Sequence, residues 1–261
     1  MFSASVLGVP LYDVLWGFYV FCVLGVIVEM VFCLAKEGVL ESRVGLLYLP
    51  LSPIYGFGGV AIGLFLYRYL DQPVIMFFVG ILVGTVLEYV ASLVMEKAFH
   101  TVFWDYSDKP LNLHGRVCAQ YSIYWGFLSL LLLYVIVPPT ARLIDAIDPA
   151  VGAPLLVVLL VLTLLSTVLT LGSFGRLERR IERIRAGDPA DSPNSWDRLL
   201  ERLAPDHVVI DTFPRMSLVL EYLQLTGEQR RWIRVDAHWG RPSELHRQHR
   251  QLVSVYEGDA P

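Results

Sequence analysis

Residues 74–95 read VIMFFVGILVGTVLEYVASLVM, and this run decides the fold. It is long enough to cross the hydrocarbon core of a bilayer as a helix, which takes about 20 apolar residues. Four other runs meet or approach this length, at residues 11–35, 54–70, 119–137 and 151–174. The composition agrees, because 55% of the 261 residues are hydrophobic, 18% are charged and the mean hydropathy is +0.53. The sequence therefore predicts an all-α, polytopic membrane helix bundle with five transmembrane helices.

The charged residues divide the chain unevenly. Of the 21 Lys and Arg, seven lie within residues 1–175 and 14 lie beyond. We expect a transmembrane domain at 1–175, a basic helix and linker at 176–195, and a small, mainly helical cytoplasmic region at 196–261. The tail holds as many acidic side chains as arginines. It therefore has no net positive charge, and no nucleic-acid partner is expected. His246 and His249 lack further ligands beside them, and the sequence predicts neither a metal nor a cofactor.

The basic residues of the loops predict the orientation, because cytoplasmic loops retain Lys and Arg. The first and third loops are richer in these residues than the second and fourth, which carry only Arg68 and Arg142. The tail opens with a further group of arginines. Five spans with the N-terminus outside satisfy these counts. Both polar loops and the C-terminal tail then lie in the cytoplasm.

Two parts of the transmembrane region resemble each other. Residues 25–29 of the first span read GVIVE, and residues 84–88 of the third read GTVLE. Each span is followed by a polar loop and a returning helix that begins PIYGFGG at residue 53 or SIYWGF at residue 122. This pattern predicts two parallel hairpin repeats. Repeats related by an axis along the membrane normal occur in transporters, where the site lies at the repeat interface.

Each predicted repeat carries one carboxylate within the membrane, Glu29 or Glu88. Measured from the lysine that ends each span, both lie roughly 10–14 Å inside the cytoplasmic boundary. An acid at such depth is costly and by default marks a functional site or pathway. In the alternative interpretation, Arg43 and Arg116 fold back onto these acids in ion pairs that only lock the helices.

The third span leads into a segment dense in aromatic, acidic and amide groups, WDYSDKPLNLHGR at residues 104–116. Because this loop, the first loop and both acids converge on one side of the membrane, we predict a shared polar site. As alternatives, Glu96 is merely solvated at the interface, and Trp104 and Tyr106 belong to an aromatic belt. The candidate substrate-binding residues are Glu29, Arg43, Glu88, Glu96, Trp104, Asp105, Tyr106, Asn112 and Arg116.

These motifs resemble the bacterial membrane-protein family named "Putative ABC-transporter type IV", also called CmpB-like. The correspondence includes PIYGFG at residues 53–58, EY at 88–89, WDYS at 104–107 and GR at 115–116. The resemblance implies a multi-pass protein of the bacterial cytoplasmic (inner) membrane with a role in transport. The chain has no GxxxxGK[ST] motif, so an ABC system would need a separate ATPase or other membrane subunit. A homo-oligomer is also compatible with the sequence.

Three classes of function follow. In the first, the chain is a permease-like or transport-associated protein in which Glu29 and Glu88 bind a cation, a proton or a cationic solute. In the second, it is a membrane-embedded enzyme for a lipid-linked substrate, with Asp105 as base and Arg116 and Lys109 holding phosphate. In the third, it is a non-catalytic assembly or regulatory subunit whose polar loops dock a partner.

Overall fold

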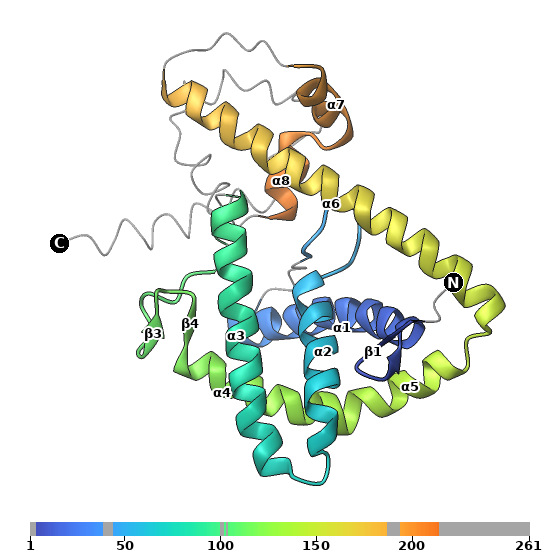
Figure 1. Cartoon of the computed structure of the whole chain (residues 1–261). Coiled ribbons are helices and arrows are strands. Elements are labelled where there is room, and N and C mark those ends of the chain that lie inside the picture. The colour runs from blue at the N-terminus through green and yellow to red at the C-terminus, as the bar shows by residue number, and fades with distance from the viewer. Residues whose placement is uncertain (1–3, 39–43, 100–101, 103, 187–193, 214–261) are drawn as a thin grey trace. The chain divides into compact units, whose positions relative to one another are not determined.

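The computed structural model describes residues 4–38, 44–99, 102, 104–186 and 194–213, and this part of the chain is mostly helical (Figure 1). Two short antiparallel hairpins, β1–β2 and β3–β4, accompany the helices. In chain order the elements are β1 (Ser5–Val6), β2 (Val9–Pro10), α1 (Leu11–Glu37), α2 (Pro53–Leu66), the 3₁₀ turn η1 (Tyr67–Tyr69), α3 (Pro73–Phe99), β3 (Asn112–Leu113), β4 (Val117–Cys118), α4 (Ala119–Leu131), the π-helical η2 (Leu132–Ile136), α5 (Val137–Asp145), α6 (Pro149–Arg185), α7 (Ser195–Leu203) and α8 (Asp206–Thr212).

Four helical stretches are long and apolar enough to cross a membrane: Leu11–Ala35, Pro73–Lys97, Ala119–Asp145 and Pro149–Arg183. They correspond to four of the five predicted spans. The remaining run, residues 54–70, forms the 14-residue helix α2 and the turn η1. At 1.5 Å per residue α2 is about 21 Å long, which is shorter than a hydrocarbon core of about 30 Å. The count of five spans therefore stays a prediction.

Glycines allow two pairs of helices to pack closely. α2 packs against α1, and α4 packs against α3. A Cβ atom built at Gly56 of α2 would lie 2.7 Å from a ring carbon of Phe18, and one at Gly126 of α4 would lie 2.7 Å from a ring carbon of Phe77. Cβ atoms do not approach other atoms so closely, so each contact depends on the missing side chain.

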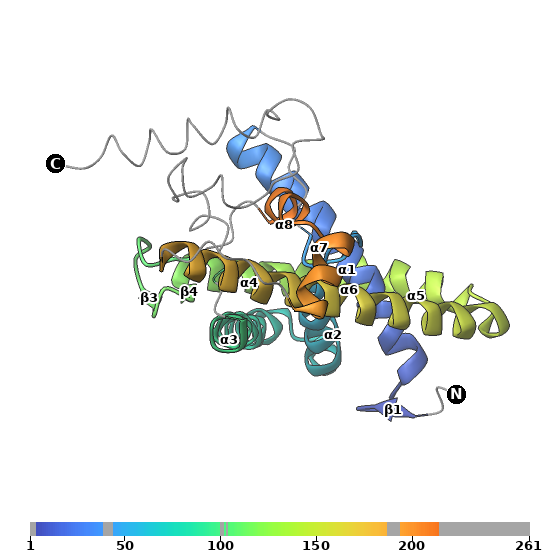
Figure 2. The ribbon, with the colours of Figure 1, turned by 90° about the horizontal axis from the view of Figure 1, so that it is seen from above.

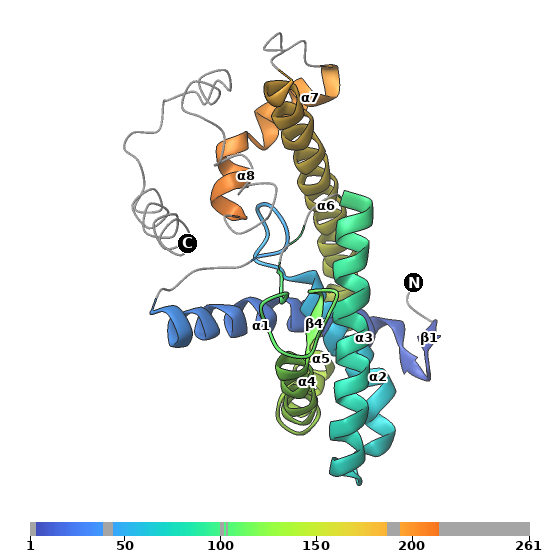
Figure 3. The same ribbon diagram turned by 90° about the vertical axis from the view of Figure 1, so that its left-hand side faces the viewer.

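The helices cross one another around a shared apolar core. Figures 1 and 3 show α2 and α3 side by side with α1 lying across α2. Figure 2, which looks down on α2 and α3, shows α4 and α5 extending sideways past them. The core joins α1, α2, α3 and η2 through six buried side chains: Phe21, Ile62, Leu66, Met76, Leu132 and Leu133.

The rod formed by α4, η2 and α5 is continuous in spite of two consecutive prolines. Pro138 and Pro139 lie in the first turn of α5, directly after the π-helical η2. Proline lacks a backbone N–H and crowds the preceding turn, and a wider π turn accommodates both effects. The widened turn thus lets the helix pass the prolines and bury Leu132 and Leu133 in the core.

Residues 46–49, ahead of α2, form a tight turn whose backbone is bound by α6. The Leu47 N–H donates to Thr170 Oγ1 at 3.0 Å, and Ser166 Oγ donates to the Leu47 carbonyl at 2.5 Å. Tyr48 has a left-handed φ of 62° and donates its hydroxyl to the Leu203 carbonyl at 2.7 Å. Leu47 is fully buried, and buried backbone groups outside a helix or sheet require such partners. This turn therefore ties α2 to α6 and to α7.

The C-terminal part of α6 packs against α7 and α8. Arg176, only 2% exposed, pairs with Asp206 at 2.6 Å, and Arg180 pairs with the other oxygen of the same carboxylate. Arg179 pairs with Asp197 at 2.6 Å. These ion pairs occupy three of the arginines that open the predicted tail. α6 also passes through the predicted boundary at residue 175 without a break, and the division into three parts stays a prediction.

Candidate functional site

Glu88 lies in α3, and its carboxylate is held by two aromatic side chains from different segments. Tyr106 Oη donates to Oε1 at 3.1 Å, and Trp125 Nε1 donates to Oε2 at 3.0 Å. Glu88 is only 6% exposed. Within the described ranges no cationic side chain pairs with it. The carboxylate is thus buried between neutral donors.

Gly84, one helical turn before Glu88, makes room for Trp125. A Cβ atom at Gly84 would lie 2.6 Å from Trp125 Cδ2. Non-bonded atoms do not approach so closely, so any side chain at this position would collide with the indole. The Trp125 side chain can therefore lie close to the α3 backbone at Gly84 and reach the carboxylate. Thr85, the next residue, donates its hydroxyl to Ser122 Oγ of α4 at 2.8 Å, which also fixes α4 against α3.

Glu29 of α1 also has an aromatic donor, which comes from α2. Tyr55 Oη of α2 donates to Glu29 Oε1 at 2.6 Å. A Cβ atom at Gly25 would lie 2.6 Å from Tyr55 Cδ2. In both helix pairs, α1–α2 and α3–α4, a glycine and a glutamate four residues apart therefore contact the same aromatic residue of the second helix.

The similarity of contacts extends further along both pairs of helices. Gly56, which follows Tyr55, would collide with Phe18 if it carried a Cβ, and Gly126, which follows Trp125, would collide with Phe77. Phe18 lies seven residues before Gly25 in α1, and Phe77 lies seven residues before Gly84 in α3. By these contacts Tyr55 of α2 corresponds to Trp125 of α4. Alignment of the motifs PIYG and SIYW instead makes Tyr55 correspond to Tyr124.

Tyr106 is fixed in position by the loop between α3 and α4. Its backbone N–H donates to the Gly115 carbonyl at 2.7 Å, and its ring stacks on that of Tyr121, with centroids 4.6 Å apart. Burial raises the pKa of the Tyr106 hydroxyl, and the charge and hydrogen bond of Glu88 raise it further. The phenol therefore keeps its proton near neutral pH and serves as a donor.

Asp105 and Asn112 are used inside the same loop. Asp105 Oδ1 accepts from the Ser107 N–H at 2.9 Å and from Ser107 Oγ at 2.6 Å. The Asn112 side-chain amide donates to the Lys109 carbonyl at 2.9 Å, and its oxygen accepts from the Gly115 N–H at 3.1 Å. Gly115 has a φ of 68°, a conformation that glycine adopts without strain. Both side chains thus stabilise the turn itself.

Arg116 and Glu96 form an ion pair. Arg116 also donates to Ser92 Oγ at 3.3 Å and lies over the Tyr89 ring, 5.8 Å from its centroid. Trp104 Nε1 donates to the Arg116 carbonyl at 3.0 Å. Arg116 is therefore bound to Glu96 rather than to Glu88, and the predicted locking pair is not the one that forms.

The candidate residues thus fall into four groups. Tyr106 meets Glu88; Trp104, Glu96 and Arg116 lie together; Asp105 and Asn112 brace the loop; and Glu29 has its donor in α2. Arg43 lies outside the described residues. Sequence reasoning missed Trp125 and Tyr55. The available signal was an indole and a phenol in apolar helices, because such groups find an acceptor when buried.

A model of the family described as "Putative ABC-transporter type IV" matches residues 16–171. The match begins in α1 and ends in α6, so it includes both glutamates, both returning helices and the loop of Tyr106. Neither a curated protein nor a solved structure matches the chain. The match and the four apolar helices fit a membrane protein associated with transport. Since the matched part is more than half of the 261 residues, the chain belongs to the Putative ABC-transporter type IV family.

Proposed function

We propose that this protein is a permease-like or transport-associated membrane component whose polar centre is Glu88. The observation that carries the proposal is a buried carboxylate, 6% exposed, with two neutral donors and no counter-ion in the described part of the chain. An ionised carboxylate in a dry environment is expensive. A proton or a bound cation removes this cost, so the centre would take up and release one of them.

The two hydrogen bonds of Glu88 leave lone pairs of the carboxylate for such a ligand. An ionised carboxylate offers about four lone-pair sites, and Tyr106 and Trp125 occupy one on each oxygen. The two donors orient the group without neutralising its charge. Cation or proton uptake is therefore compatible with both hydrogen bonds.

The matching contacts of the two helix pairs support the further proposal of two hairpin repeats. In this proposal α1–α2 carries Glu29 and α3–α4 carries Glu88, each beside a glycine and an aromatic donor. The donors differ, phenol in one and indole in the other. The two acids would then act as related but unequal ligands, as expected where duplicated halves line one pathway.

The finer topology belongs to the same proposal. The basic loops favour five spans, with α2 and η1 together as the short second one, the N-terminus outside the bacterial inner membrane and the tail in the cytoplasm. A separate ATPase would supply energy, since the chain lacks a P-loop motif. Other membrane subunits or a second copy of the chain would complete the pathway.

One observation favours a second candidate, a non-catalytic subunit that docks a partner through the loop at residues 104–118. The polar groups of this loop are used internally, by Asp105, Asn112 and Arg116, and therefore build a defined surface. The same contacts weigh against the lipid-linked enzyme. As such an enzyme, the chain would use Asp105 as base and Lys109 to hold phosphate. Asp105 instead accepts from Ser107, and Lys109 pairs with Asp108 at 2.6 Å.

The proposal is tested by infrared difference spectroscopy of the full-length protein in nanodiscs. Protons or candidate cations are added, and the carboxyl bands of the wild type are compared with those of Glu88→Gln. We expect a cation-induced or pH-induced carboxyl band that disappears in Glu88→Gln and remains in Glu182→Gln, which changes an exposed glutamate of α6. An identical response in wild type and Glu88→Gln would contradict a role for Glu88. Tyr106→Phe, which removes one donor but keeps the charge, should shift this band without abolishing it.

A further inference from the structure

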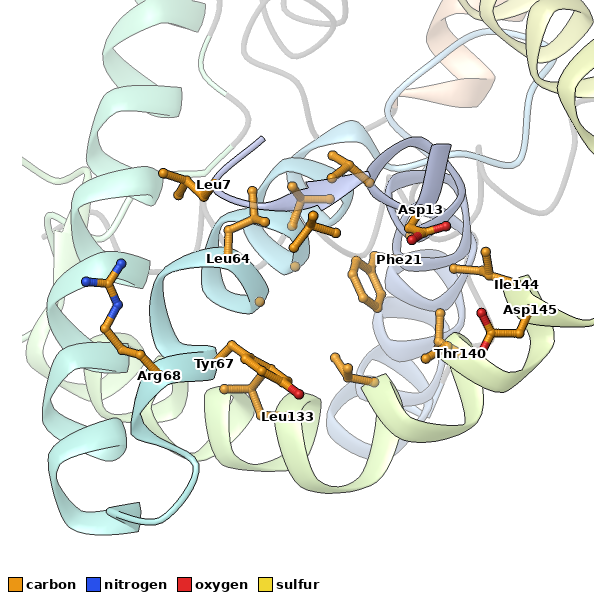
Figure 4. Close-up of a pocket in the computed structure, with 18 residues that line it drawn as sticks. Leu7, Asp13, Phe21, Leu64, Tyr67, Arg68, Leu133, Thr140, Ile144 and Asp145 are labelled. Atoms are coloured by element: carbon orange, nitrogen blue, oxygen red, sulfur yellow. The ribbon is translucent and has the colours of Figure 1, made fainter. Parts of the chain in front are cut away.

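A cavity of about 600 Å³ lies between the start of α1, the end of α2 and the η2–α5 segment (Figure 4), and neither glutamate nor any of their aromatic donors lines it. Asp13, in the first turn of α1, lines it. Glu29 lies 16 residues further along the same helix, a distance of about 24 Å. The cavity is therefore separate from the polar centre proposed above, and the inference below does not rest on that function.

Small residues create this cavity. Gly17, Gly59 and Gly63 line it. A Cβ at Gly59 would lie 2.5 Å from Phe21 Cδ2, so this glycine is needed for the α1–α2 contact. A Cβ at Gly63 would meet nothing within 4 Å, so the space in front of Gly63 is open. The hollow next to Gly63 is thus available to a ligand.

Most of the lining is apolar, but two carboxylates lie at one end. Asp13 and Asp145 lie on the same wall, and Arg68 lies across the cavity from them (Figure 4). In the part of the chain that the structure describes, neither carboxylate has a hydrogen bond or an ion pair. Arg142 precedes Asp145 by less than one turn and makes no ion pair with it either.

The position of these acids favours a positively charged ligand. Asp13 is in the first turn of α1, where the helix dipole stabilises an anion. Asp145 is the last residue of α5, where the dipole disfavours one. Two like charges on one apolar wall also repel each other. A cation between them would relieve both penalties, and Arg68 would direct the cationic end of the ligand toward the acids.

We propose that this cavity binds an amphiphile with an apolar body and a basic nitrogen, the nitrogen lying between Asp13 and Asp145. A volume of about 600 Å³ is typical of sites for drug-sized molecules, which are mostly apolar with a few placed polar groups. Leu64, Leu133 and Ile144 contribute the apolar surface for the body of the ligand. The acid pair supplies the selectivity for its charge.

Three naphthalene probes of similar shape test the proposal: 2-(1-naphthyl)ethylamine, 2-(1-naphthyl)ethanol and 1-naphthylacetate. Their binding to the full-length protein in nanodiscs is measured by equilibrium dialysis, against empty nanodiscs. We expect the amine to bind about tenfold or more tightly than the alcohol, as for a ligand with charged hydrogen-bond partners. The acetate should bind most weakly.

Variants separate the contributions of charge and of space. The double variant Asp13→Asn, Asp145→Asn should lose the preference for the amine and keep the binding of the alcohol. Asp71→Asn, which changes an acid outside the cavity lining, should retain the preference. Gly63→Leu fills the open space and should abolish binding of all three probes, with folding checked by its melting temperature. Glu88→Gln should leave all affinities unchanged, so a failure here and a failure of the proposed function are distinguishable.

Three results would overturn the proposal. The first is equal binding of the amine and the alcohol, which would show an apolar hollow without charge selectivity. The second is an unchanged preference in the double aspartate variant. The third is saturable binding in a correctly folded Gly63→Leu protein, or no saturable binding of any probe to the wild type.

Discussion

Replacing Gly84 by alanine tests the packing on which the Glu88 site depends. The added methyl group would lie 2.6 Å from Trp125 Cδ2 and closer still to other atoms of that side chain. An ordinary contact needs about 3.5–4.0 Å, so the indole must move by about 1 Å or more. Such a movement breaks the 3.0 Å hydrogen bond between Trp125 Nε1 and Glu88.

The magnitude follows from three effects. Overpacking of a tight contact costs about 1–3 kcal/mol, and loss of a hydrogen bond to a charged group costs about 1.5–3 kcal/mol. Replacing glycine in a helix returns up to about 1 kcal/mol. We therefore expect Gly84→Ala to lower the free energy of unfolding by about 2–5 kcal/mol.

Gly63→Ala is the matched control, because Gly63 also lies within a helix but a Cβ there meets nothing within 4 Å. It should stabilise the protein by about 0.5–1 kcal/mol. Unfolding is measured by titration with a denaturing detergent, followed by tryptophan fluorescence. In a Trp125→Ala background, where neither the clash nor the hydrogen bond can occur, Gly84→Ala should cost little further stability. If Gly84→Ala is as stable as Gly63→Ala, the close contact between α3 and Trp125 is wrong.

Two further predictions concern the tail and the tyrosine of the site. Asp206→Asn leaves Arg176 and Arg180 without their shared carboxylate. Since Arg176 is 2% exposed, we expect the free energy of unfolding to fall by about 3–5 kcal/mol, seen as faster proteolysis at residues 194–213. An unchanged cleavage rate would contradict the buried pairs. The pKa of Tyr106 is raised in the folded protein, so its contribution to stability is complete below about pH 10, the value for an unfolded tyrosine, and is lost as the pH rises further. The melting temperature of the wild type should accordingly fall above about pH 10. The melting temperature of Tyr106→Phe should fall less steeply over the same range.

The apolar runs were sufficient to predict most of the fold. Four of the five runs correspond to helices that are long and apolar enough to span, because a bilayer imposes one length on every such helix. The run at residues 54–70 was less informative. It is rich in glycine and lies between Pro53 and Pro73, so α2 is only 14 residues long, and its place in a membrane depends on neighbours that no local pattern describes.

The candidate site shows where such reasoning ends. Glu88 and Tyr106 stand out in the sequence as polar residues within or beside an apolar run, and the structure brings them together. The partner of Arg116 could not be predicted, because the loop turns through left-handed Leu111 and His114, with φ of 55° and 56°. Non-glycine residues rarely adopt that conformation, so the sequence carries no sign of it. The pairing of the α6 arginines with Asp206 likewise depends on how α7 and α8 fold back.

The turn at Leu47 and Tyr48 has a mechanical consequence. It is held on one side by Ser166 and Thr170 of α6 and on the other by Leu203 of α7, and it leads directly into the helix that carries Tyr55. A partner protein that bound α7 and α8 and rotated α6 would therefore also move this turn. The movement would be passed through α2 to Tyr55, whose phenol donates to Glu29. Binding of a partner to the C-terminal helices would thereby alter the hydrogen bond to this acid.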